Sequence, residues 1–145
     1  MNRSILIALS LLLFLPVARA EDHEEEEEKT PLGEEMSAMN KAWRSIKRAA
    51  GDASQNESNL LLMDQVIQAC LNSVDMVPIR SEELPEEKRP EYIEAFQKEI
   101  RELNKRFEAL KSAFESGDNE TAQELIKEID DFKKEGHKEF KPIDD

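Results

Sequence analysis

The chain has 145 residues, a formal net charge of −13 at neutral pH and a single cysteine. Such an acidic chain is a poor candidate for binding nucleic acid or anionic lipid surfaces, and we expect any protein partner to be basic. One cysteine excludes an internal disulfide, so the fold must be stabilised by packing alone. Cys70 falls within an apolar helical pattern, which favours a buried and inert thiol.

Residues 1–20 have the pattern of a secretory signal peptide. Arg3 supplies the positive charge, residues 5–15 are apolar apart from Ser10, and Ala18-Arg19-Ala20 is a small-x-small cleavage site. An uncleaved anchor is the alternative, but the apolar stretch is too short to span a membrane and acidic residues follow it at once. We expect cleavage after Ala20, export to the bacterial periplasm and no membrane attachment afterwards.

Residues 21–31 form an acidic segment that contains five consecutive glutamates, Glu24–Glu28. This segment has no apolar periodicity, and we expect a solvated, disordered tail. His23 lies within it, but a flexible acidic run has no fixed ligand geometry, so the segment does not predict a metal site.

Two amphipathic helices are predicted in the first half of the remaining chain. The first begins near Leu32 and ends before Gly51, and the second has Asn56 or Ser58 as its cap and ends at Pro78. Their apolar residues recur three and four positions apart. These stripes are Leu32, Met36, Met39, Trp43, Ile46 and Ala50 in the first helix, and Met63, Ile67, Cys70, Val74 and Val77 in the second, widened by Leu60, Leu61, Leu62 and Val66.

Two further helices are predicted in the second half. One opens with Pro90 in its first turn and closes at Gly117, and the next is capped by Asp118 and runs towards Phe140 and Pro142. The stripes are Ile93, Phe96, Ile100, Leu103, Phe107, Leu110 and Phe114 in the third helix, and Ala122, Leu125, Ile126, Ile129 and Phe132 in the fourth.

The connections predict how these helices are arranged. The first and second helices, and the third and fourth, are joined by short links, which makes those neighbours antiparallel, while residues 78–89 allow a longer crossing. No segment alternates as a β-strand does. We therefore predict an all-α fold, an antiparallel up-down-up-down four-helix bundle in residues 32–141.

Met36 and His137 are the candidate ligands of a cofactor. In this topology the beginning of the first helix and the end of the fourth lie at the same end of the bundle. A thioether and an imidazole together are the pair that holds haem iron in six-coordinate electron carriers. Considered singly, a stripe methionine more often fills a core, and a histidine near a helix C-terminus more often lies on the surface.

The residues around this pair resemble the cytochrome b562 family. Leu32, Met36 and Asn40, with Lys47-Arg48-Ala49, are similar to the family's opening helix, whose methionine is the sixth iron ligand. The spacing from Gly117 to His137 matches that from the family's loop glycine to its fifth ligand. Residues at the family's positions of apolar contact with haem are Met63, Phe96 and Ile100; the last helix also shares Glu120, Ala122 and Gln123.

The resemblance implies a periplasmic cytochrome that carries single electrons on a haem b. Because no Cys-x-x-Cys-His precedes His137, the haem would be bound non-covalently. One residue departs from the pattern: Gly136 stands where the best-known member of the family has an aromatic residue, and a glycine there loosens the backbone that orients the imidazole.

No set of side chains in the sequence predicts an enzyme, because there is no Ser/His/Asp arrangement, closed cysteine cluster or phosphate-binding loop. We expect a monomer whose partners are haem and an unidentified, basic redox protein. Two alternatives stay open: a haem-free helical interaction or stress protein of the periplasm, and a protein that stores or delivers haem at the same site.

Overall fold

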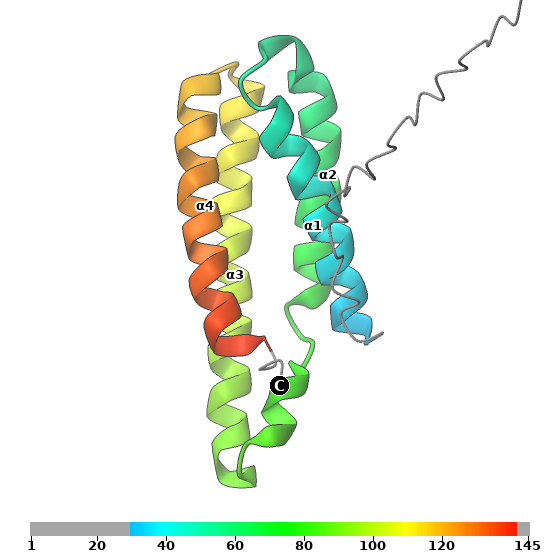
Figure 1. Ribbon diagram of the computed structural model, residues 1–145, viewed down its shortest axis with the longest axis vertical. Coiled ribbons are helices and arrows are strands. Elements are labelled where there is room, and N and C mark those ends of the chain that lie inside the picture. Colours follow the sequence, from blue (N-terminus) through cyan, green and yellow to red (C-terminus); the bar gives the residue numbers. More distant parts are fainter. Residues whose placement is uncertain (1–29, 142–145) are drawn as a thin grey trace, which may run out of the picture.

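Four α-helices lie side by side in an antiparallel bundle in the computed structural model, which describes residues 30–141 (Figure 1). The prediction of an all-α, up-down-up-down fold is confirmed, and no β-strand occurs in the described part. The signal peptide and nearly all of the acidic tail lie outside these residues. The helices are α1 (Pro31–Ala49), α2 (Asn56–Ser73), α3 (Arg89–Glu115) and α4 (Asn119–Phe140), with the 3₁₀ turns η1 (Ala53–Gln55), η2 (Ile79–Glu83) and η3 (Glu86–Lys88) between them.

The hydrophobic core runs along the axis of the bundle and is built from the predicted stripes. At its middle the rings of Trp43 and Phe107 pack with their centroids 5.4 Å apart. None of the helices from residue 30 to residue 141 has the length and apolar character needed to cross a membrane. The larger buried apolar residues are Met39, Trp43, Ile46, Met63, Val66, Ile67, Cys70, Phe96, Ile100, Leu103, Phe107, Leu110, Phe114, Ile126, Ile129 and Phe140.

Two residues assigned to the core by periodicity are exposed instead. Leu61 is 64% exposed because it lies on the side of α2 opposite to the core. Val77 is 54% exposed because α2 ends at Ser73, four residues earlier than the apolar spacing predicts. Pro78 cannot donate a backbone hydrogen bond and restricts the residue before it, so the chain leaves the helix ahead of the proline.

The start of α2 also differs from the prediction. Its N-cap is Gln55, whose side chain makes no capping hydrogen bond, so neither Asn56 nor Ser58 caps this helix. The reason is that η1, itself capped by the carboxylate of Asp52, leads directly into α2. Asn56 is thus free to reach across the bundle, where its amide donates to Asn119 Oδ1 at 3.0 Å.

The ends of the other helices follow ordinary capping rules. Thr30 caps α1, since its hydroxyl accepts from the backbone N–H of Gly33 at 3.0 Å. Asp118 caps α4 as predicted and accepts from the N–H of Thr121 at 3.0 Å. Gly117 closes α3 with a φ of +70°, a conformation that favours glycine.

Long polar side chains join α1 to α4 across the seam between these two helices. Asp130 accepts from Trp43 Nε1 at 2.7 Å and from Lys47 Nζ at 2.9 Å. Nearer the other end of the seam, Lys133 Nζ donates to Asn40 Oδ1 at 2.9 Å. These bridges link α1 to α4 close to the segments that carry Met36 and His137.

Candidate functional site

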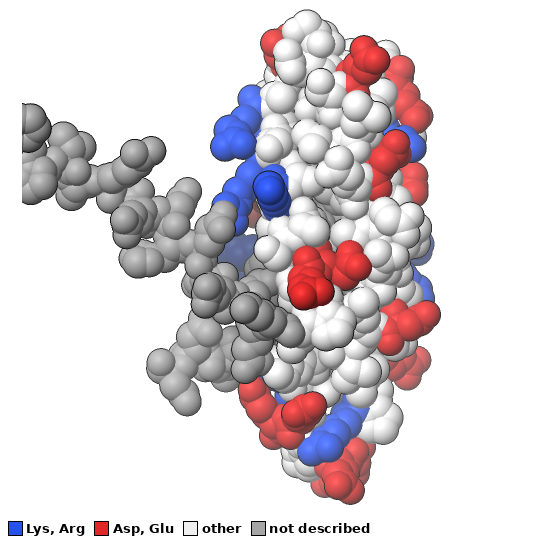
Figure 2. Space-filling model, turned by 90° about the vertical axis from the view of Figure 1, so that its right-hand side faces the viewer, with Lys and Arg blue, Asp and Glu red and all other residues white. Residues whose placement is uncertain are grey.

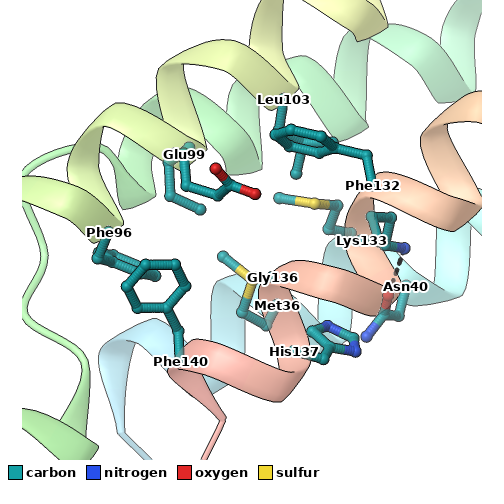
Figure 3. A pocket seen from close by; sticks show the side chains of 12 residues that line it. Met36, Asn40, Phe96, Glu99, Leu103, Phe132, Lys133, Gly136, His137 and Phe140 are labelled. Atoms are coloured by element: carbon teal, nitrogen blue, oxygen red, sulfur yellow. Dashed lines mark hydrogen bonds between the residues drawn. The ribbon is translucent and has the colours of Figure 1, made fainter.

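A hollow of about 70 Å³ lies among α1, α3 and α4, at the end of the bundle where α1 begins and α4 ends. This space is enough for several water molecules. Three helices contribute side chains to it, and most of these are apolar (Figure 3). The residues that line it are Met36, Met39, Asn40, Phe96, Glu99, Ile100, Leu103, Phe132, Lys133, Gly136, His137 and Phe140.

The α1 wall carries the candidate thioether ligand. Met36 is partly buried and its side chain points into the hollow. Met39, one turn further along α1, is 1% exposed and belongs to the core beneath it. Asn40 stands at the edge of the hollow, held there by Lys133 of α4. Heptad spacing thus places Met36 between the buried side chain of Met39 and the hollow.

The α4 wall carries the candidate imidazole ligand. His137 is exposed, and its ring lies at the rim of the hollow beside Asn40 (Figure 3). α4 continues unbroken through Gly136 to Phe140 and ends with the N–H of Lys141 bonded to the carbonyl of His137 at 3.1 Å. The glycine therefore does not interrupt the helix that orients the imidazole.

Residues outside α4 hold its last turn in place. The guanidinium of Arg80, in η2, donates to the carbonyl oxygens of Lys138, Glu139 and Lys141 at 3.0, 2.7 and 3.2 Å. The hydroxyl of Tyr92 donates to the carbonyl of Glu139 at 2.8 Å. A cation at a helix C-terminus satisfies its terminal carbonyls and interacts favourably with the helix dipole. This clamp fixes the turn on which His137 lies.

The α3 wall contributes aromatic and aliphatic surface together with one carboxylate. Phe96 packs edge-on against Phe140, with ring centroids 5.4 Å apart. The Glu99 carboxylate points into the hollow between these rings and Leu103 (Figure 3). Burial raises the pKa of Glu99, and the neighbouring negative charge of Glu139 raises it further.

Cys70 of α2 lies behind the α3 wall and plays no part in lining the hollow. Its thiol is fully buried and lies 3.4 Å from the carbonyl oxygen of Ile100, to which it donates. Burial raises its pKa to about 12, so the nucleophilic thiolate does not form near neutral pH. The prediction of a buried, inert thiol is confirmed.

The seven predicted site residues fall into two groups. Leu32 and Met63 do not line the hollow: Leu32 packs against the core one turn before Met36, and Met63 is fully buried on α2, a helix that does not border this space. The remaining five meet around the hollow, and they are Met36, Asn40, Phe96, Ile100 and His137.

Several lining residues were not predicted from the sequence. Glu99 is the most informative, because it lies three residues after Phe96 and four before Leu103, on the face of α3 that forms the core. A charged residue within an apolar stripe was a signal that could have identified it. The others gave a weaker signal, because they read as ordinary members of a helical pattern, and they are Met39, Leu103, Phe132, Lys133 and Phe140.

The donor atoms at the hollow suit a haem better than a bare metal ion. Among residues 30–141 no group of three or more His, Cys, Asp or Glu side chains is arranged to hold an ion. Thioether and imidazole groups, which Met36 and His137 carry, are instead the kinds of group that bind haem iron in proteins, and apolar walls suit a porphyrin. By ligand chemistry and lining, the residues present fit this group.

The fold defines a class, that of antiparallel four-helix bundles, and in this class cofactor sites are built between facing helices, as the hollow is here. The sequence profile of the cytochrome b562 family matches residues 31–141, which include all four helices, and the chain therefore belongs to this family. Its members are electron carriers that use a b-type haem. No curated protein and no solved structure matches the chain.

Proposed function

We propose that this protein is a periplasmic b-type cytochrome that binds one haem without covalent attachment and transfers single electrons. The observation that carries the proposal is the presence of Met36 and His137 on one hollow, from opposite ends of the described chain. His137 would supply the stronger iron bond and Met36 the softer one. A thioether ligand favours ferrous iron and so raises the reduction potential.

The bound haem would supply the ferric/ferrous couple, and the protein's own residues would do the rest. Phe96, Ile100 and Phe140 would exclude water from the porphyrin, and the Arg80 clamp would hold the imidazole in position. A haem is larger than the hollow, so binding requires the walls to separate. Met36 and Phe132 are only partly buried, and we expect these side chains to move.

The export and the partner remain parts of the proposal. The pattern of residues 1–20 supports a periplasmic location. Acidic side chains are more widespread than basic ones on the face shown in Figure 2, where basic ones lie at the upper left, along the right edge and near the bottom, and this supports a basic redox partner. Met36 and His137 would together hold the iron and leave no site on it for oxygen, which would suit an electron carrier rather than an enzyme.

Spectroscopy of two single-residue variants tests the proposal. The wild-type protein titrated with haem should give a low-spin spectrum and a higher melting temperature. Haem at a thousandfold excess over Kd should add roughly 4 kcal/mol to the free energy of unfolding. His137→Ala should weaken binding by more than 100-fold, beyond the effect of about 10- to 100-fold that a neighbouring group has. Met36→Ala should still bind haem, with a high-spin component and a lower potential.

Matched controls identify the ligands. Met39→Ala removes a thioether from the same helix, and it should destabilise the fold while leaving the spectrum low-spin. If both His137→Ala and Met36→Ala keep the wild-type low-spin spectrum, other residues are the ligands. A purified protein that stays colourless and melts unchanged after incubation with haem would instead support a haem-free interaction protein.

A further inference from the structure

Glu99 is an acidic side chain at the centre of an otherwise largely apolar hollow. Its carboxylate makes no hydrogen bond or ion pair with any residue from 30 to 141, although Glu102, one turn along α3, pairs with Lys105 and Arg106. Glu99 is also partly buried, which is a costly position for an unpaired charge. A carboxylate kept here without a partner favours a ligand that brings positive charge.

Gly136 of α4 lies beside this carboxylate. A Cβ placed on Gly136 would lie 3.5 Å from Glu99 Oε1 and 3.7 Å from its Cγ, both ordinary van der Waals distances, so the glycine leaves room for a methyl group beside the Glu99 side chain. A side chain that reaches well beyond a Cβ at position 136 would compete with Glu99 for the space beside it. The glycine before His137 therefore leaves the space between α4 and the Glu99 carboxylate open.

We propose that Glu99 makes this pocket selective for a cationic metalloporphyrin, and so favours ferric over ferrous haem. The proposal rests on the proposed haem site and names the charge state that the site prefers. A ferric porphyrin core carries one positive charge, and a ferrous or zinc(II) core carries none. In a water-poor site a neighbouring carboxylate stabilises the charged core and not the neutral one.

The charged groups that act on the pKa of Glu99 oppose one another. Lys98 and Arg106 lower the pKa of Glu99, but Glu139 and Glu102 raise it, and the effect of burial exceeds each of them. Arg106 is engaged with Glu102 and stacks over the ring of Phe132 at 4.3 Å. Among residues 30–141, no cationic side chain lies close enough to Glu99 to form an ion pair with it.

The test compares the binding of two porphyrins to three forms of the full mature chain. The probes are ferric haem and zinc protoporphyrin, which share the same ring and propionates and differ in core charge. The readout is the ratio of their dissociation constants, zinc over ferric, at low ionic strength and mildly alkaline pH. Glu99→Gln removes a negative charge from the hollow. Glu102→Gln is the matched control, because it removes a negative charge from the same helix at a position outside the hollow.

We expect the ratio to fall about tenfold in Glu99→Gln, the effect of one charge–charge interaction at intermediate dielectric, and to stay unchanged in Glu102→Gln. The reduction potential of the haem-bound protein should rise in Glu99→Gln alone. Without porphyrin, Glu99→Gln should melt no lower than wild type, because it removes an unpaired, partly buried charge; this confirms that the variant folds.

The outcomes separate the two proposals. If both porphyrins bind and the ratio is the same in all three forms, the inference about Glu99 is wrong and the haem site stands. If Glu102→Gln lowers the ratio as much as Glu99→Gln, the selectivity comes from the overall charge of the protein and not from Glu99. If neither porphyrin binds the wild-type chain, the proposed function and this inference both fail.

Discussion

The two ends of this bundle are built from the same amphipathic helices but are stabilised in different ways. At the end where α1 meets α2 and α3 meets α4, the links are short and the interior is filled, with Phe114 2% exposed and Ala122 fully buried. A network from Asn119 to the carbonyl of Ala50 at 2.7 Å, and to Asn56, joins the two hairpins. We call this the closed end.

The opposite end, which we call the open end, holds the hollow. Here Met36 and Phe132 are only partly buried, His137 is exposed, and the last turn of α4 is held by the Arg80 guanidinium. The difference indicates a division of roles. Packing at the closed end fixes the fold, and the open end is left incompletely packed, as the proposed haem site would require.

The largest expected effect comes from removing an aromatic ring at the closed end. Phe114→Ala should lower the free energy of unfolding by about 3–5 kcal/mol, because the ring is almost fully buried and leaves a cavity. Phe132→Ala, the matched change at the open end, should cost about half as much, since that ring is partly exposed. Urea unfolding of the haem-free protein measures both.

Haem binding gives the opposite ranking and serves as the control. Phe132→Ala should weaken haem binding more than Phe114→Ala does, because only Phe132 lines the hollow. Equal losses of stability for the two variants would contradict the division between a closed and an open end.

The contrast between the ends also explains what the sequence could predict. Phe107 and Phe114 were predicted to lie in the core, and both are buried. The spacing of apolar residues predicts burial correctly wherever a helix packs against both of its neighbours. Leu61 and Val77 were predicted to be buried and are exposed. The apolar pattern included Leu61, which lies on the side of α2 opposite to the core, and it continued to Val77, which follows the end of α2. Glu99 was missed because its place in the apolar stripe of α3 marks it only as unusual, and the folded structure is needed to show that it borders a hollow shared with α1 and α4.

The next largest effect should come from the clamp at the open end. Arg80→Gln removes hydrogen bonds to three terminal carbonyls of α4 and should cost about 2 kcal/mol. Hydrogen exchange should locate the loss in the last turn of α4, with the amides of α2 and the closed end protected as in wild type. A uniform loss of protection along the chain would show that Arg80 supports the whole fold rather than its open end.

A smaller effect is expected at the seam between α1 and α4, which lies between the two ends of the bundle. Burial raises the pKa of Asp130, but the hydrogen bonds from Lys47 and Trp43 outweigh it and hold that pKa below its ordinary value of 3.8. A carboxylate with a lowered folded-state pKa adds stability above its unfolded pKa, and this is lost as the pH falls through the folded value. Asp130→Asn should cost about 1 kcal/mol at neutral pH.

The pH dependence distinguishes this ion pair from simple packing. The difference in stability between wild type and Asp130→Asn should be constant above pH 3.8 and shrink in more acidic solution. Trp43 is the only tryptophan, so its fluorescence reports the same site during unfolding. If the difference in stability between the two proteins stays the same in strong acid, the loss in Asp130→Asn would come from steric effects and not from the lost charge.

The smallest effect should be a gain, and it tests whether the open end keeps its shape at the expense of stability. Gly136→Ala should raise the stability of the haem-free protein by about 0.5–1 kcal/mol, because glycine inside a helix is less favourable than alanine by that amount. The new Cβ would meet Glu99 Oε1 at 3.5 Å, an ordinary contact that needs no rearrangement. Thermal unfolding of the variant measures the gain. A loss of stability instead would show that the Glu99 side chain cannot yield even this little space, and that Gly136 is required by the carboxylate and not merely tolerated by α4.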